Sequence, residues 1–179
     1  MDRVVIIGTS GSGKTTLAAR LAEQLEHEHI ELDALFWRPG WEETPRDEFK
    51  EIVARVCERP TWVIAGNYSS TREVVWTRAD TLIWLNFDFE LVMKRITRRT
   101  LERAWTGAEL WGGNQETWRN VFSKSSMIWW SAKTWSRRRR EYAELLADDR
   151  YQHLNVLEFA TPEHLESWLG ALARSSKLA

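Results

Sequence analysis

Short apolar runs alternate with amphipathic segments along most of the chain. Runs rich in Val, Ile and Leu cover residues 3–8, 61–66, 81–86 and 153–159, and the shorter segment 29–33 has a similar pattern. Apolar runs of four to eight residues are typical of strands that are buried on both faces. We therefore predict five short strands.

Amphipathic segments between these runs predict the helices. Helical spacing of apolar residues begins near residues 14, 44, 90, 116 and 161. In the second segment, Thr44 takes the N-cap position and Pro45 the first helical position, whereas the stretch "ALFWRPGW" after Asp33 is predicted to be a loop. Strands alternating with helices predict an α/β fold of three layers, with a parallel five-stranded sheet and a helical lid before the last strand.

Length and composition indicate one soluble unit. The chain has 179 residues, of which 43% are hydrophobic and 28% charged, so we expect a single domain over 1–179 with a lid insertion at about 95–140. No apolar run could span a bilayer and the N-terminus lacks a signal-peptide pattern, so we expect a cytoplasmic protein without a membrane partner. Cys57 is the only cysteine, which excludes an intramolecular disulfide.

Charge is unevenly distributed. Residues 94–140 contain twelve Lys or Arg against three Glu, a net charge of +9, which leaves −10 for the rest because the whole chain carries −1. Six of the 12 Trp also fall in this segment. Such a segment could contact an anion or stack nucleic acid bases, or its aromatic residues could simply pack the lid.

A glycine-rich stretch directly after the first predicted strand carries the most specific signal. "GTSGSGKTT" has the spacing G-x-x-x-x-G-K-[ST] between a strand and a helix, which is the context that a P-loop requires. Lys14 is expected to reach the β- and γ-phosphates of ATP, and the Thr15 hydroxyl to ligate Mg²⁺. A turn without a ligand is the alternative. The predicted ATP-binding residues are Gly8, Thr9, Ser10, Gly11, Ser12, Gly13, Lys14, Thr15 and Thr16.

Arginines of the basic segment suit phosphoryl transfer. On the helix that starts near Glu90, the predicted inward face of Phe89, Val92 and Ile96 continues to Arg99, and Arg95 lies one turn before it. A guanidinium binds phosphate oxygens in a bidentate manner and stays charged. We therefore expect Arg95 and Arg99 to contact phosphate; a solvated basic face is the alternative.

At this point the sequence resembles adenylate kinase and its relatives: a P-loop, a basic lid with "RITRR" on the incoming helix, and arginines on the outgoing one. "HIELDALFWRPGWEETPRDEF", "WVIAGNYSSTR" and "ADTLIWLNF" resemble more closely the bacterial DNA topology modulation proteins, which are predicted adenylate-kinase-like kinases. The resemblance implies that Arg95 lies near the adenine, that residues 159–164 contact the base, and that Gly66 and Asn67 with Arg72 border the acceptor.

One position departs from the kinase pattern. Where the family has a metal-binding Asp before the glycine, this chain has Ala65. Asp33, at the end of the second predicted strand, could bind the metal or the acceptor instead, as similar aspartates do in shikimate-type kinases, and could serve as general base. A loop-capping role is the alternative.

The loop after Asp33 contains aromatic residues and an arginine. Phe36, Trp37 and Arg38 would suit a flat, anionic acceptor such as a nucleotide, and they would equally suit a packed loop.

Four consecutive arginines, Arg137 to Arg140, lie on the predicted long helix. Neighbouring helical residues point about 100° apart, so the four cannot face one ligand. The predicted inward face consists of Trp118, Phe122, Ser125, Trp129, Ala132, Ser136, Arg139, Ala143 and Leu146. Arg139 is therefore the predicted catalytic phosphate contact, with Arg137 as the second choice.

These features predict an ATP- and Mg²⁺-dependent kinase that phosphorylates a nucleotide-like or nucleoside-like small molecule. The alternative is an ATP-binding regulator that contacts nucleic acid through the basic segment. The sequence leaves the oligomeric state open.

Overall fold

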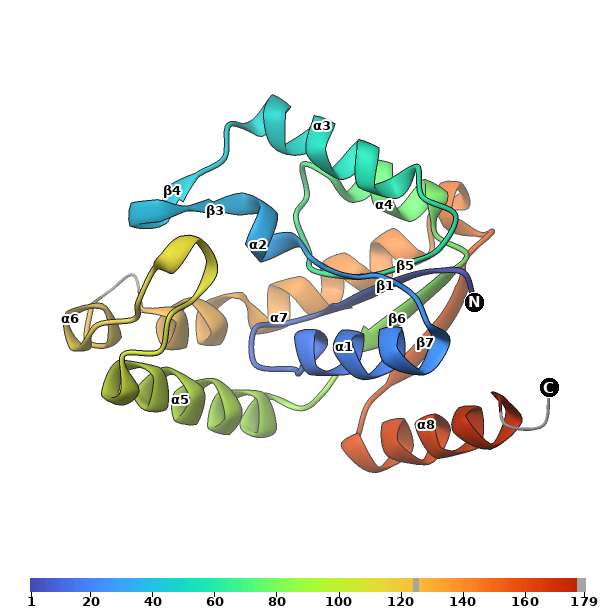
Figure 1. Ribbon diagram of the computed structural model, residues 1–179. Helices are drawn as coiled ribbons and strands as arrows, with labels where there is room; N and C mark the ends of the chain where they lie inside the picture. Colours follow the sequence, from blue (N-terminus) through green and yellow to red (C-terminus); the bar gives the residue numbers. More distant parts are fainter. Residues whose placement is uncertain (124–125, 177–179) are drawn as a thin grey trace.

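The computed structural model describes residues 1–123 and 126–176 as three layers around a parallel sheet (Figure 1). The strand order is β2-β5-β1-β6-β7, and each neighbouring pair is parallel. The bounds are β1 (Arg3–Gly8), β2 (His29–Glu31), β5 (Trp62–Ala65), β6 (Thr81–Leu85) and β7 (Asn155–Phe159). The predicted α/β fold with five parallel strands is confirmed.

Helices cover both faces of this sheet. One face packs against α1 (Lys14–Leu25), α8 (Pro162–Ser176) and the start of α5 (Phe89–Thr106); the other packs against α3 (Arg46–Cys57), α4 (Arg72–Arg78) and the end of α7 (Met127–Leu146). Within β1, Val4 and Ile6 belong to the first layer and Val5 and Ile7 to the second. Because both faces are buried, the strands need continuous apolar runs.

The segment after β2 is more ordered than predicted. The strand ends at Glu31, and Asp33 lies in the short helix α2 (Leu32–Phe36). A two-stranded antiparallel hairpin follows, made of β3 (Trp37–Arg38), η1 (Pro39–Trp41) and β4 (Glu42–Glu43). The predicted N-cap is wrong: α3 begins at Arg46, and the buried Thr44 hydroxyl donates instead to Leu35 O at 3.0 Å. The hairpin folds back on α2, so Thr44 closes the hairpin rather than capping the helix.

The lid between β6 and β7 is interrupted where one long helix was predicted. After α5 come η2 (Trp111–Gly113) and the short α6 (Trp118–Val121), and α7 starts only at Met127, with Ser126 accepting a hydrogen bond from Ile128 N as its N-cap. A last turn, η3 (Asp149–Tyr151), leads into β7. In the part of the chain described here, no helix combines the length and the apolar character needed to cross a bilayer.

The predicted inward face of the lid is also wrong. Phe122 is 78% exposed and Trp129 is 67% exposed, whereas Ser131, Thr134 and Tyr142 are the buried residues of α7. Ser125, also assigned to that face, lies outside the described residues. Small side chains let α7 pack closely on α5, so the large aromatic residues at its start remain outside. Phe89 on α5 is likewise exposed, while Val92 and Ile96 are fully buried as predicted.

Candidate active site

The loop between β1 and α1 curls into a compact cradle. Gly13 precedes α1 in the left-handed region, at φ 97°, and no side chain caps the helix there. A Cβ on Gly11, whose φ is 85°, would lie 3.0 Å from Val92 O of α5. The loop closes through a hydrogen bond from Ser12 N to Thr9 O at 3.2 Å. Glycine is therefore needed both for the curvature and for close packing on α5.

Lys14 fills the interior of this cradle. Its Nζ donates to Gly8 O and Thr9 O, both at 3.1 Å. Burial lowers the pKa of Lys14 to about 8; the Asp33 carboxylate opposes this shift, and Arg99 and Arg138 add to it. An ammonium that is buried near two guanidiniums is stabilised by an anion, so the cradle is electrostatically suited to phosphate.

Two arginines from different helices of the lid share this environment. Arg99 comes from α5, and burial, followed by Arg103, lowers its pKa. Arg138 comes from α7; its Nη1 donates to Tyr142 Oη at 2.9 Å and its guanidinium lies 4.7 Å from the Trp130 ring centroid. The Nε atoms of both arginines are buried without a hydrogen-bond partner among the described residues. Buried unsatisfied N–H groups are costly, and a phosphate oxygen would satisfy them.

Arg138, and not Arg139, lies close enough to Lys14 to lower its pKa. Arg139 stacks on Trp135 with its guanidinium 4.7 Å from the ring centroid, and Arg137 is exposed. The predicted inward face of the helix differs from the observed one because the prediction placed the large aromatic residues inside, whereas they are exposed. Arg138 is therefore the better placed candidate for a phosphate contact on α7, and the role of Arg139 stays a prediction.

A cavity of about 300 Å³ opens on one side of the cradle, between α1, α5 and α8. Arg95 lies in its wall, with Nη1 3.4 Å from Ser12 O and its guanidinium 5.4 Å from the Phe87 ring centroid. Thr16 and Pro162 also line it. Residues predicted for ATP from the P-loop, the lid helix and the segment 159–164 are thus brought together around a space of ligand size.

Thr15 meets an acidic residue that the sequence analysis missed. Its hydroxyl donates to Glu31 Oε1 at 2.5 Å, and Glu31 Oε2 accepts from Trp111 Nε1 at 2.8 Å. Glu31 ends β2, two residues before Asp33, so an acidic residue at a strand end was the available signal. Asp33 Oδ1 instead accepts from Tyr68 Oη at 2.5 Å. In the structure Thr15 is thus paired with Glu31, and the metal pair of Thr15 and Asp33 stays a prediction.

These two oxygen donors fit Mg²⁺ in a nucleotide complex. Among the described residues, no three His, Cys, Asp or Glu side chains converge into a complete metal site. Mg²⁺ in kinases takes few protein ligands and completes its octahedron with phosphate oxygens and water. A hydroxyl and a carboxylate beside the P-loop match that requirement.

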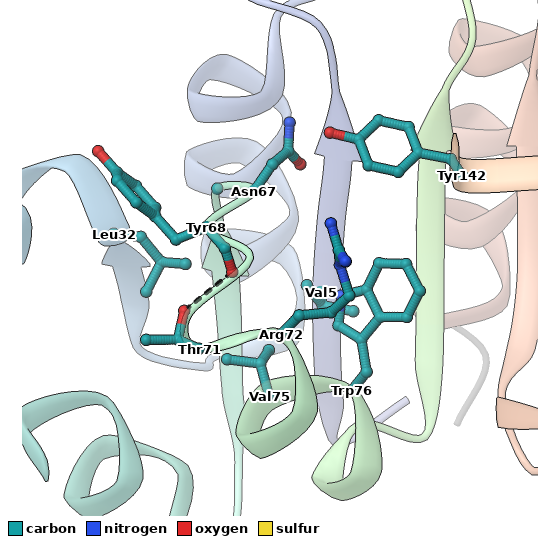
Figure 2. A pocket seen from close by; sticks show the side chains of 10 residues that line it. Val5, Leu32, Asn67, Tyr68, Thr71, Arg72, Val75, Trp76 and Tyr142 are labelled. Atoms are coloured by element: carbon teal, nitrogen blue, oxygen red, sulfur yellow. Dashed lines mark hydrogen bonds between the residues drawn. The ribbon is translucent and has the colours of Figure 1, made fainter. Parts of the chain in front are cut away.

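A much smaller pocket lies on the other face of the sheet. A pocket of about 10 Å³, space for a single water, lies under residues from β1, α4 and α7 (Figure 2). Asn67, one of its lining residues, is bound to the P-loop itself, since its amide donates to Gly8 O and accepts from Gly8 N. A Cβ on Gly66 would lie 2.7 Å from Leu32 Cβ, so this glycine allows β5 to approach α2.

The arginines predicted to bind an anionic acceptor are engaged by carboxylates. Arg72 points into the pocket and its Nη2 lies 2.6 Å from Glu141 Oε1, while Arg38 is paired with Glu48 (Figure 2 for Arg72). Phe36 packs on Tyr68 with ring centroids 4.5 Å apart, and on Trp37 at 5.0 Å. The aromatic loop is therefore packed, the second of the two readings open from the sequence.

Comparisons with known proteins agree with this architecture. The chain is 29% identical over 113 residues to the shikimate kinase of Paramagnetospirillum magneticum, a match that covers 54% of this chain and 57% of that enzyme. The chain thus spans little more than half the length of this relative. A protein of Bacillus subtilis called uncharacterized protein YqaC is 24% identical, with 80% of this chain and 81% of that protein covered.

Solved structures share the fold at low identity. Shikimate kinase from Acinetobacter baumannii, in complex with shikimate, has a TM-score of 0.60 at 17% identity, covering 100% of this chain and 96% of that one. A gluconokinase from Sinorhizobium meliloti has a TM-score of 0.50 at 21% identity, with 98% and 94% covered. Residues 4–177 match the AAA_33 family model, described as an AAA domain, so the chain belongs to that family of P-loop proteins.

Proposed function

We propose that this protein is an ATP-dependent kinase that transfers the γ-phosphoryl group to a hydroxyl of a small molecule. The observation that carries the proposal is that Arg99 and Arg138 both act on Lys14 of the P-loop, while their guanidinium Nε atoms are buried without a hydrogen-bond partner in the described part of the chain. Phosphoryl transfer develops charge on the equatorial oxygens, and cations fixed around them lower its barrier. The kinase names of its relatives support the same reaction class.

Each cation has a distinct part in this proposal. Lys14 binds the β- and γ-phosphates from within the loop, Arg99 approaches from α5, and Arg138 approaches from α7. Because the two arginines belong to the two helices of the lid, their joint contact with one phosphate holds the lid closed and excludes water. Arg95 and the cavity of about 300 Å³ take the adenine side of ATP.

Thr15 and Glu31 are the residues proposed to hold Mg²⁺. The ion supplies charge neutralisation between the β- and γ-phosphates when it is bound. The Thr15 hydroxyl donates a hydrogen bond to Glu31, so a lone pair of its oxygen stays available to a metal ion beside the P-loop.

The acceptor hydroxyl is assigned to Asp33. Burial, and then Asp33 itself, raises the pKa of Tyr68, so the phenol stays protonated and fixes one carboxylate oxygen by donating to it. The carboxylate can accept a further hydrogen bond from an acceptor hydroxyl and take its proton during transfer. Since Arg72 and Arg38 are already paired with carboxylates, we favour a hydroxyl compound over the nucleotide acceptor expected from the sequence.

The test is a panel of acceptors, read by mass spectrometry for phosphorylated product and for ADP. It contains shikimate, gluconate, other small polyols and hydroxy acids, nucleosides and mononucleotides. We expect product with at least one hydroxyl acceptor and none with Lys14→Ala. Undiminished transfer by Lys14→Ala, or ADP release that no acceptor stimulates, would contradict the proposal.

Nucleic acid binding is a second candidate function, favoured by aromatic side chains exposed on the basic lid. Trp105 is 82% exposed, and Trp118 stacks on Phe122 with ring centroids 6.3 Å apart. Exposed aromatic faces among cations can stack unpaired bases. The resemblance to DNA topology modulation proteins stays a prediction. Fluorescence anisotropy of labelled single-stranded and duplex DNA at low salt tests it, and absence of binding to both would remove this candidate.

A further inference from the structure

One carboxylate joins the P-loop to the lid. Glu31 accepts from the Thr15 hydroxyl through Oε1 at 2.5 Å and from the Trp111 indole through Oε2 at 2.8 Å. Thr15 is next to the P-loop lysine, whereas Trp111 lies in η2, 80 residues along the chain from Glu31. The two hydrogen bonds fix both oxygens of the carboxylate.

The backbone of the loop that carries the indole is held in place by a buried amide. Asn114, only 5% exposed, accepts from Trp41 N at 2.8 Å and donates to Arg38 O at 2.8 Å and Trp111 O at 2.7 Å. A Cβ on Gly112 would lie 2.8 Å from the carbonyl carbon of Arg38, so the lid loop and the hairpin are in direct backbone contact. Trp111 therefore has a defined position over Glu31 only while the lid loop is seated on the hairpin.

The charge of the group that donates to Glu31 affects what the carboxylate can bind. Glu31 lies close enough to Lys14 and Arg99 to oppose slightly the lowering of the pKa of each, so its negative charge is felt at the P-loop. An indole N–H is a neutral donor that orients a carboxylate without neutralising it. An arginine or lysine at this position would orient Glu31 equally well but would cancel the negative charge that a metal ion needs.

We propose that Trp111 is a positioning residue, which holds the Glu31 carboxylate against Thr15 and thereby couples closure of the lid to binding of the magnesium–nucleotide complex. This inference rests on the proposed kinase function. Groups that orient a metal ligand typically contribute 10- to 100-fold to metal affinity. Seating of the lid loop and metal-dependent nucleotide binding should therefore strengthen each other.

The experiment measures nucleotide affinity rather than activity. The dissociation constant of ATP is determined by calorimetry with Mg²⁺ and with EDTA, and the ratio of the two values gives the magnesium coupling. Trp111→Phe keeps the ring beside Arg103, whose guanidinium lies 6.0 Å from the Trp111 ring centroid, but removes the N–H. We expect it to reduce the coupling roughly 10-fold while the affinity in EDTA stays unchanged.

Three further variants make the result specific. Glu31→Gln should abolish the coupling, and Asn114→Ala should reduce it as Trp111→Phe does. Trp129→Phe, in an exposed tryptophan of the same lid, should leave it unchanged. Loss of coupling in Glu31→Gln but not in Trp111→Phe would overturn the inference and leave the kinase proposal intact. A wild-type chain that binds ATP under neither condition would overturn both.

Discussion

The two sides of the P-loop differ in how ready they are for a ligand. On the side of α1, α5 and α8, a cavity of about 300 Å³ is already open and Arg95 borders it. On the side of α4 and the end of α7, the pocket around Arg72 (Figure 2) has only about 10 Å³. Arg72 is also paired with Glu141. In the kinase proposal these are the nucleotide side and the acceptor side. The first is already open, whereas the small pocket of the second, which Asp33 does not line, must widen before a substrate can enter it.

This difference suggests an order of events. A preformed site binds without reorganisation, so its affinity is not reduced by the population of a minor state. A closed site binds only the fraction of molecules in which it has opened. In the kinase proposal, ATP would therefore bind to the open side without reorganisation, and the cost of opening the small pocket would add to selectivity among acceptors.

The largest expected effect is at Arg138, which connects the two sides through its contacts with Tyr142 and its influence on Lys14. Arg138→Ala should lower kcat by roughly 10² to 10³-fold, because it removes a cation from the transferring phosphoryl group. Arg139→Ala is the matched control, since Arg139 stacks on Trp135 instead, and should change kcat by less than about threefold. Steady-state kinetics measure kcat of both variants. Equal losses of kcat would mean that α7 turns a different face toward Lys14 than the structure shows.

The second effect concerns the pH dependence of ATP binding on the preformed side. The Lys14 pKa of about 8 means that the free protein loses this proton as pH rises through 8, whereas bound phosphate favours the protonated form. The affinity for ATP should therefore be highest below pH 8 and fall roughly tenfold per pH unit above it. Calorimetry in EDTA measures this, and Lys14→Arg, which stays charged, should remove the slope.

The third effect tests whether the acceptor side is closed to anions by its ion pair. Glu141→Gln should free Arg72 and raise kcat/KM for carboxylate or phosphate acceptors, relative to neutral polyols, by roughly tenfold. Glu48→Gln frees Arg38 on the hairpin and serves as control, because neither residue lines the pocket. An unchanged preference in Glu141→Gln would show that Arg72 does not face the acceptor.

The sheet and the P-loop were predictable because local sequence determines them. The strand over residues 3–8 is apolar from Val4 to Ile7 because both faces are buried there, and the glycine spacing of the loop depends only on its own backbone. The lid was predicted less well. On α7 the buried residues are Ser131, Thr134 and Tyr142, and a search for large apolar residues overlooks the first two because they are small and polar.

The sequence analysis did not identify Glu31, for a different reason. Its two partners, Thr15 and Trp111, lie 16 and 80 residues away along the chain, so its importance appears only once the sheet and the lid loop are assembled. The pairing of Arg72 with Glu141, 69 residues apart, is of the same kind. Residue types were readable from the sequence, whereas the partners that decide their roles depend on tertiary packing.

The smallest expected effect is at the outer wall of the nucleotide cavity, where Arg20 and Glu166 form an ion pair with distances of 2.5 and 2.8 Å. The hydrogen bond from Arg20 lowers the pKa of Glu166, but the side chains are 49% and 56% exposed, so solvent screens the pair. Glu166→Gln should therefore shift Tm by less than about 3 °C. It should also raise ATP affinity by less than about threefold at low salt, because Arg20 is then free to attract phosphate.

Asp148→Asn, which breaks an exposed pair with Arg150 far from this cavity, is the matched control and should leave ATP affinity unchanged. Calorimetric titrations at low and high salt, together with thermal unfolding, measure both variants. If Glu166→Gln instead lost most of its ATP affinity, the cavity would depend on this ion pair for its shape. The nucleotide side would then be held open by a surface ion pair. It would depend on a side-chain contact for its shape, as the acceptor side does, and the two sides would differ less in how far they are preformed.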